Sequence, residues 1–219
     1  MDEMIADLPQ YLQAIGETLY MVVISLVASG VVGLVLGVAL ATTRAGGLLA
    51  HRVAYTVLNV VVNIVRPIPF IIFVTAIDPL TILVVGTTIG PTAGAFALSV
   101  AAAFAVSRIV EQSLLAVEPG VLEAARAAGA GPLRVITTVL IPEGLGPLVL
   151  GYTFLFVGIV DMTAQVGAIG GGGLGDFAIT YGAQRYNWPI VYLTVATIVV
   201  LVQVGQFAGN ALARKALRR

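Results

Sequence analysis

The stretch from Thr18 to Thr43, TLYMVVISLVASGVVGLVLGVALATT, contains no charged residue. The hydrocarbon core of a bilayer is about 30 Å thick, and a helix needs about 20 apolar residues to cross it. Because an apolar segment in lipid must satisfy its backbone hydrogen bonds internally, this stretch predicts a membrane-spanning helix. Barrel strands are short and alternate between apolar and polar residues, so a β-barrel is disfavoured.

The composition of the whole chain also indicates a membrane protein. Of its 219 residues, 59% are hydrophobic and only 10% are charged. Soluble domains carry about 25% charged residues, so lipid must cover much of this surface. The absence of cysteine excludes disulfides, and a single histidine, His51, argues against a metal site. The first ten residues hold three acids and no base, unlike a secretory signal peptide, so we expect the first apolar helix to be retained.

Four further apolar stretches follow the first one. Together they predict an all-α, polytopic helical bundle with five transmembrane helices. The residues from Pro79 to Gly90 exceed what one helix needs and are expected to form part of an outer loop. We expect one transmembrane domain over residues 1–219, with spans at about 18–43, 53–77, 88–112, 144–168 and 187–213.

Basic residues predict the orientation of these spans, because Lys and Arg near span ends favour the cytoplasm. With the C-terminus inside, only Arg185 lies outside, together with Asp2, Glu3, Asp7, Asp78 and Asp176. We therefore predict that the N-terminus is outside and the C-terminus cytoplasmic. The inner loops and tail would then hold eight basic residues: Arg44, Arg52, Arg126, Arg134, Arg214, Lys215, Arg218 and Arg219.

The segment 118–143, EPGVLEAARAAGAGPLRVITTVLIPE, does not resemble lipid-facing sequence. Pro119 and Gly120 predict a turn, the following residues favour a helix, and Gly129 predicts its end. Pro132 suits the first turn of another helix. We predict a short amphipathic helix on the cytoplasmic side, whose small surface residues suit insertion into a cleft of another protein. A plain loop would not explain the ordered alanines and glycines.

This segment resembles the EAA loop of permeases of ATP-binding-cassette (ABC) importers, which reads EAA, three residues, G, nine residues and I-x-L-P. Here Val139, Ile141 and Pro142 fall at the later positions. The resemblance implies a coupling helix that docks in a groove of a separate ATP-hydrolysing subunit, where Arg126 would pair with an acid. The residues expected to contact that subunit are Glu123, Ala124, Ala125, Arg126 and Gly129.

Nucleotide binding by this chain itself is not expected. A P-loop, GxxxxGK[ST], is absent from the sequence. The cluster Gly170–Gly173 is followed by Leu174-Gly175-Asp176, without the required Lys, and lies on the predicted outer side. ATP and Mg²⁺ would therefore bind the partner ATPase subunit, and we expect no cofactor on this chain.

Three further segments resemble methionine-uptake permeases of this class: NIVRPIPFII at 63–72, IGGGGLGDFAI at 169–179 and QFAG at 206–209. The resemblance covers nearly the whole chain. It implies a homodimer in the bacterial cytoplasmic (inner) membrane, two ATP-binding subunits and an extracytoplasmic substrate-binding lipoprotein. The substrate would be D- or L-methionine or a related amino acid. Residues 161–165, DMTAQ, depart from the family's G-Y-S-A-M, which leaves another amino acid or small solute open.

Two charges fall within predicted spans. By helical rise, Arg66 lies about 20 Å and Asp161 about 25 Å from the inner side. Charges at such depths are costly and should face protein or water. Asp161 pairs with Arg66, lines the path, or does neither. Pro67 and Pro69 interrupt the backbone hydrogen bonds of the second span, which predicts either a gate-shaping bend or a tolerated kink. The candidate path or gate residues are Arg66, Pro67, Pro69, Asp161, Thr163 and Gln165.

Near the inner end of the third span, Arg108 and Glu111 are spaced for a local ion pair. Other classes of function have less support. A secondary transporter would often show two similar halves, which the sequence lacks. A membrane enzyme would need a histidine cluster, a metal-ligand spacing or a nucleophile with its base, and none is apparent. We expect a lipid-embedded transport subunit that neither catalyses a reaction nor binds nucleic acid.

Overall fold

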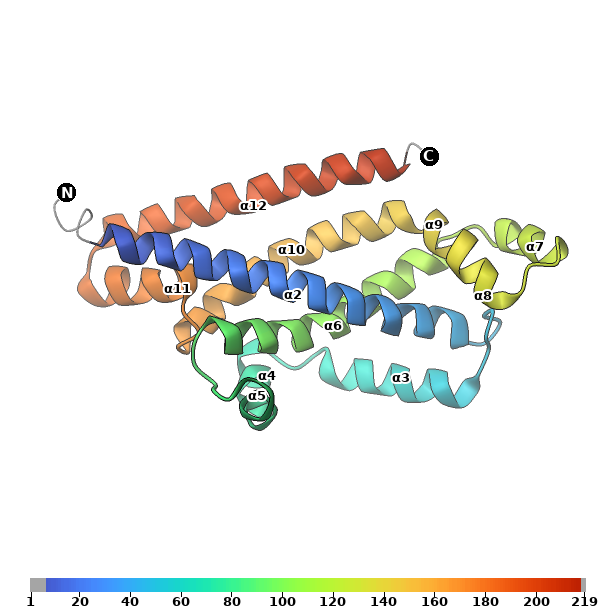
Figure 1. The fold of residues 1–219 in the computed structure, drawn as a ribbon, viewed down its shortest axis with the longest axis horizontal. Coiled ribbons are helices and arrows are strands. Elements are labelled where there is room, and N and C mark those ends of the chain that lie inside the picture. The colour runs from blue at the N-terminus through green and yellow to red at the C-terminus, as the bar shows by residue number, and fades with distance from the viewer. Residues whose placement is uncertain (1–6, 218–219) are drawn as a thin grey trace.

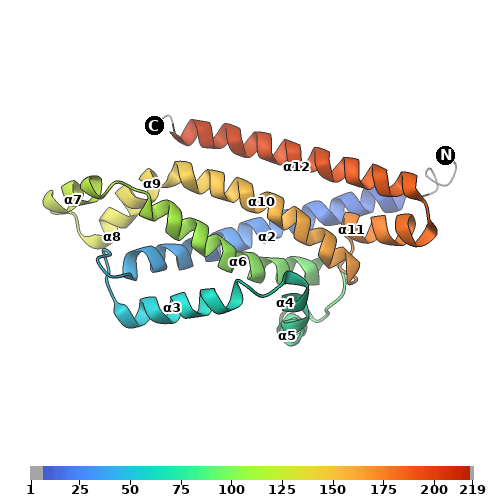
Figure 2. The same ribbon diagram turned by 180° about the vertical axis from the view of Figure 1, so that it is seen from behind.

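A computed structural model describes residues 7–217, apart from the side chain of Leu217. The described chain is helical, and its long helices run roughly along one axis (Figures 1 and 2). Asp2, Glu3, Arg218 and Arg219, which entered the prediction of orientation, lie outside the described residues.

Four helices are long and apolar enough to cross a membrane. A fifth candidate is a bent pair of helices, α3 and α4, so the count is four to five, in agreement with the predicted helical bundle. The first helix begins well before the uncharged stretch that predicted it. The four long helices are α2 (Leu8–Thr43), α6 (Pro91–Leu115), α10 (Leu145–Ala168) and α12 (Trp188–Leu217).

The predicted second span, 53–77, is not one continuous helix. It divides into α3 (Arg52–Val65) and α4 (Phe70–Ala76), which meet at an angle of 109°. Pro67 and Pro69 lie in the break and cannot donate backbone hydrogen bonds, so the helix cannot continue through them. The prolines therefore turn the chain sharply rather than kink one helix.

The expectation of a loop from Pro79 to Gly90 is partly wrong, because α5 occupies Asp78–Val85. Pro79 lies in its first turn, where a missing N–H does no harm. Gly86 ends the helix in the left-handed conformation, with φ of 86°. These two residues mark the ends of α5 in the sequence.

Close packing of α2 on α6 forms the centre of the molecule. A Cβ atom on Gly33 would lie 2.3 Å from the Cβ of Val106, and one on Gly37 would lie 2.4 Å from that of Val110. Both valines are fully buried. The glycines therefore permit an approach of the two backbones that any larger residue would prevent.

Apart from α4 and α5, the short elements gather at the two ends of the long helices (Figure 1). One end, called the α7 end, carries α7 (Pro119–Ala127), α8 (Pro132–Val135), η1 (Ile136–Leu140) and α9 (Ile141–Glu143). The opposite end, called the α11 end, carries α11 (Gly173–Phe177), η2 (Ala178–Gly182) and η3 (Ala183–Arg185). In both views, α12 lies on one side of the molecule and α3, α4 and α5 lie on the other (Figures 1 and 2).

Candidate functional site

The helix α7 projects at the end of the molecule, and none of its residues is buried. It ends as the sequence predicts, at Gly129, whose φ is 84°. The N–H of Gly129 donates to the carbonyl of Arg126, and the N–H of Ala130 donates to that of Ala125. This pair of bonds is the Schellman motif, which satisfies the last carbonyls of a helix.

One side of α7 is attached to the rest of the chain. Leu122 packs against the buried cluster that includes Leu114 and Leu140. Glu123 and Arg126 line a cavity of about 180 Å³ beside the ends of α2 and α6. Of the five residues predicted to contact an ATPase, Ala125 is half-buried, while Glu123, Ala124, Arg126 and Gly129 are exposed. The helix is therefore held on one side and open on the other.

On α10, the charged residue Asp161 lies on an exposed stripe. Leu150, Phe154, Gly158, Asp161 and Gln165 are spaced three or four residues apart, so they share one face of the helix. Phe154 is 76% exposed, and a Cβ on Gly158 would meet nothing within 4 Å. We call these five residues the α10 stripe. Within the described chain, Leu150, Phe154 and Asp161 are exposed, and Gly158 and Gln165 are half-buried.

The polar groups of the α10 stripe contact each other. The side-chain amide of Gln165 donates to Oδ2 of Asp161 over 3.3 Å. Asp161 is exposed and Gln165 half-buried. Thr163, also a candidate path residue, is instead 4% exposed and donates to the carbonyl of Val160. Within the subunit Thr163 therefore does not face the open side that Asp161 faces.

Arg66 lies beside the break between α3 and α4 and is exposed, as are Pro67 and Pro69. Within residues 7–217 its guanidinium has no hydrogen-bond or ion-pair partner. The suggested pair of Arg66 with Asp161 is therefore not formed within this chain. The break is nevertheless close to α10, because Phe70 belongs to the same apolar cluster as Met162.

The predicted pair of Arg108 and Glu111 is confirmed. Nη1 of Arg108 lies 2.5 Å from Oε2 of Glu111, and both side chains are largely buried. Nη2 of Arg108 also donates to the side-chain oxygens of Asn59, over 2.6 Å, and Asn63, over 2.7 Å. Arg108 thus ties α6 to α3, a role that the pairing prediction did not include.

At the α11 end, two side chains of α2 cap α11. The carboxylate of Glu17 accepts from the N–H of Gly173 over 2.7 Å, and Oγ1 of Thr18 accepts from that of Leu174 over 2.8 Å. A Cβ on Gly172 would lie 2.5 Å from Oε2 of Glu17. The glycine cluster therefore fits a carboxylate of its own chain, and the sequence offers no local signal for a contact so distant.

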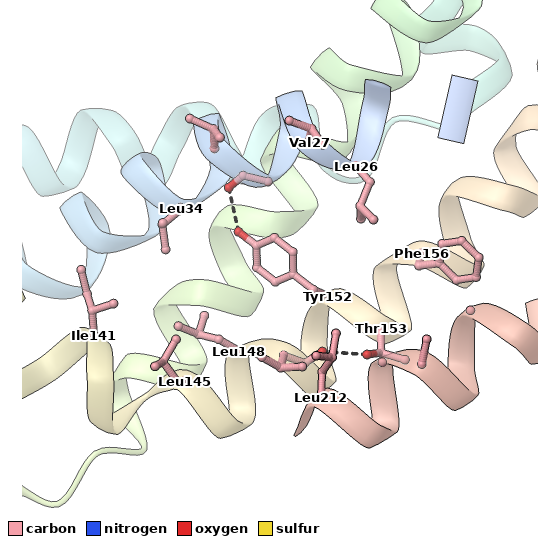
Figure 3. A pocket seen from close by; sticks show the side chains of 16 residues that line it. Leu26, Val27, Leu34, Ile141, Leu145, Leu148, Tyr152, Thr153, Phe156 and Leu212 are labelled. Carbon is pink, nitrogen blue, oxygen red and sulfur yellow. Dashed lines mark hydrogen bonds between the residues drawn. The ribbon is translucent and has the colours of Figure 1, made fainter. Parts of the chain in front are cut away.

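An apolar groove of about 680 Å³ lies between α2, α10 and α12 (Figure 3). Tyr152 reaches across it, and its hydroxyl donates to the carbonyl of Gly30 over 2.7 Å. Figure 3 shows Leu34, Leu148 and Phe156 around this contact. By helical spacing, Leu148, Tyr152 and Phe156 lie on the face of α10 opposite the α10 stripe. The two faces of α10 therefore differ in character, one apolar and the other carrying a charge.

Within residues 7–217, no group of three or more His, Asp or Glu side chains could hold a metal ion. Two exposed parts of the described chain carry predicted site residues, the open side of α7 and the polar part of the α10 stripe. The first suits mechanical contact with a protein. The second suits contact with a polar solute.

Comparison with known proteins assigns a class to this arrangement. The chain is 44% identical over 204 residues to the probable D-methionine transport system permease protein MetI of Vibrio cholerae, covering 93% of this chain and 91% of that protein. It is 38% identical to the methionine import system permease protein MetP of Bacillus subtilis, covering 77% and 76%. An inward-facing structure of the MetNI methionine ABC transporter matches with a TM-score of 0.93 at 38% identity, covering 95% of this chain and 97% of that one. Residues 33–218 match the family described as binding-protein-dependent transport system inner membrane component, and the chain belongs to this family.

Proposed function

We propose that two copies of this chain form the membrane passage of an ATP-driven importer for methionine, D or L, or a closely related amino acid. The family is a membrane transport component and not an enzyme. The observation that carries the proposal is an exposed short helix, α7, on a chain that matches the MetNI transporter over nearly its whole length. ATP and Mg²⁺ would bind two separate ATPase subunits, and an extracytoplasmic lipoprotein would deliver the substrate.

The contact with the ATPase would be made by the open side of α7. Ala124 leaves room there for a neighbouring surface, while Glu123 and Arg126, exposed beside the cavity, supply opposite charges at its edge. Because Leu122 anchors the other side of α7 to the buried cluster, a push on the helix would be passed to the ends of α2 and α6. This attachment is what a mechanical coupling element requires.

The distribution of charge supports a cytoplasmic location for the α7 end. Six basic residues lie at this end, beside Glu118, Glu123 and Glu143, whereas the α11 end holds Asp7, Asp176 and Arg185. Basic residues favour the cytoplasm. The basic residues at the α7 end are Arg44, Arg52, Arg126, Arg134, Arg214 and Lys215.

The α10 stripe would face the passage and the second copy. A carboxylate at the bilayer centre costs about 2.5 to over 10 kcal/mol on the available scales. Asp161 is exposed in the single chain, so water or protein, and not lipid, must cover that side. Arg66, Pro67 and Pro69 adjoin α10 through Phe70 and would line the same space or form its gate.

The direct test is transport by the reconstituted complex. Liposomes that contain this chain, its ATPase and its binding protein should accumulate radiolabelled methionine only when ATP is supplied to the ATPase side. A complex with an ATPase unable to hydrolyse ATP is the control. Uptake without ATP would instead support a secondary transporter and would overturn the proposal.

The placement of the α10 stripe can be tested by crosslinking. The chain has no cysteine, so a single cysteine can be introduced without further changes. Phe154→Cys should crosslink two copies with a short bifunctional thiol reagent. Leu145→Cys, on the groove face of the same helix, is the matched control and should not. Equal crosslinking of both variants would contradict the assigned face.

A further inference from the structure

The carboxylate of Asp161 is incompletely satisfied within this chain. Gln165 is the one side chain of the described residues that donates to it, and the pair has no basic neighbour within ion-pair distance. The carbonyl oxygen of Gln165 can accept a further hydrogen bond, and its amide nitrogen keeps a second N–H donor. The two side chains together therefore offer mainly acceptors, at one point of an otherwise apolar α10 stripe.

A site of this kind fits a cationic group with several donors. A primary ammonium carries three N–H donors and one positive charge. One donor could reach Asp161 and a second the carbonyl of Gln165, which would satisfy both side chains. The neighbouring Gly158 leaves open space, since a Cβ there would meet nothing within 4 Å. A small solute can therefore approach this part of the stripe.

We propose that Asp161 and Gln165 bind the α-ammonium group of the amino-acid substrate as it crosses the membrane. This inference rests on the proposed function, because it assumes that the α10 stripe faces the passage. It adds that the membrane subunit itself, and not only an external binding protein, selects solutes with a free amino group. The apolar residues Phe154 and Leu150 continue the stripe toward the α7 end and would contact the remainder of the solute.

The experiment compares two ligands that differ at one group. Binding of methionine and of its 2-hydroxy analogue, which lacks the ammonium, would be measured on the complex with its ATPase in nanodiscs, without the binding protein. The wild-type complex should prefer methionine. Asp161→Asn should reduce this preference by about tenfold or more, the loss expected for a charge-assisted hydrogen bond. Gln165→Leu should reduce it less, and Asp161→Glu should retain part of it.

Asp78→Asn is the matched control, because it removes a carboxylate that lies on α5 and outside the α10 stripe. It should leave the preference unchanged. Thermal unfolding of each variant would separate ligand binding from a structural role. If Asp161 instead pairs with a base of the second copy, Asp161→Asn would lower the unfolding temperature without changing the ligand preference. That result would overturn the inference.

Two other outcomes would also overturn it. One is equal binding of both ligands to the wild-type complex, and the other is no measurable binding of methionine. Neither binding result would contradict the proposed function, which fails only if the complete transporter does not import methionine with ATP. The two proposals are therefore separated by the two assays.

Discussion

At the scale of single residues, Arg108 is the most connected charge of the described chain. It pairs with Glu111, which is 5% exposed, and reaches Asn59 and Asn63 on α3. The spacing of Arg108 and Glu111 predicted their pairing. The link to α3 could not be predicted, because it joins side chains 45 and 49 positions apart.

We expect Arg108→Leu to destabilise the complex by about 3–5 kcal/mol, because it leaves the buried carboxylate of Glu111 without its partner. The measurement is thermal unfolding of the purified complex in detergent. Replacing Glu111 by Leu as well should recover much of the loss, since a buried pair can often be exchanged for apolar residues. If the double variant is as unstable as the single one, the hydrogen bonds of Arg108 to Asn59 and Asn63 contribute more to stability than its ion pair with Glu111.

Gly33 and Gly16 give a matched comparison within α2. Gly33→Ala should destabilise the complex by about 1–3 kcal/mol, because the new Cβ would lie 2.3 Å from Val106. Gly16→Ala meets nothing within 4 Å and should be neutral or stabilise the helix by up to about 1 kcal/mol. Unfolding temperatures of both variants would test this. Similar unfolding temperatures of the two variants would argue against tight packing of α2 on α6.

At the scale of elements, α7 shows how well local signals define a helix. Its end before Gly129 follows from residues inside the segment, but the turn predicted at Pro119 and Gly120 is wrong, because Pro119 lies in the first turn of the helix, where its missing N–H does no harm. The same kind of signal, Pro79 and Gly86, marks α5, although the length of the apolar run suggested a loop there. Local signals also place the break at Pro67 and Pro69, but the angle of 109° depends on the apolar cluster that receives Phe70.

We expect Gly129→Ala to weaken coupling between ATP hydrolysis and uptake. The residue has φ of 84° and open space around it, so the cost is backbone strain of about 1 kcal/mol and not a clash. Methionine imported per ATP hydrolysed should fall, because the end of α7 would be displaced. Gly131→Ala is the control, since its φ is −68° and its surroundings are also open. An equal effect of both changes would contradict a role for the helix end.

At the scale of the whole molecule, the alternation of the long helices places the end of α12 and the start of α2 at opposite ends (Figure 1). This agrees with an odd number of membrane crossings if the bent pair of α3 and α4 counts as one span. Six of the basic residues then share the α7 end, as the predicted orientation requires.

Labelling single cysteines in intact cells would test this orientation. Tyr186→Cys, at a residue that is 82% exposed at the α11 end, should react with a membrane-impermeant maleimide added outside. Gly131→Cys, at the α7 end, should react only after the membrane is permeabilised. The reverse pattern would mean that the α7 end faces outward, where no ATPase could reach it.

The sequence by itself determined the helical class, the end of α7 before Gly129, the pairing of Arg108 with Glu111 and the resemblance to ABC permeases. These properties depend on composition and on residues close together in the chain. Only the tertiary structure decided that Arg66 does not pair with Asp161, that Thr163 is buried, and that Glu17 caps α11. The physical reason is that such contacts depend on the rotation and separation of whole helices. Along the uncharged stretch from Thr18 to Thr43, apolar residues specify burial in lipid or protein, but Gly33 and Gly37 allow one side of the helix to approach α6 closely.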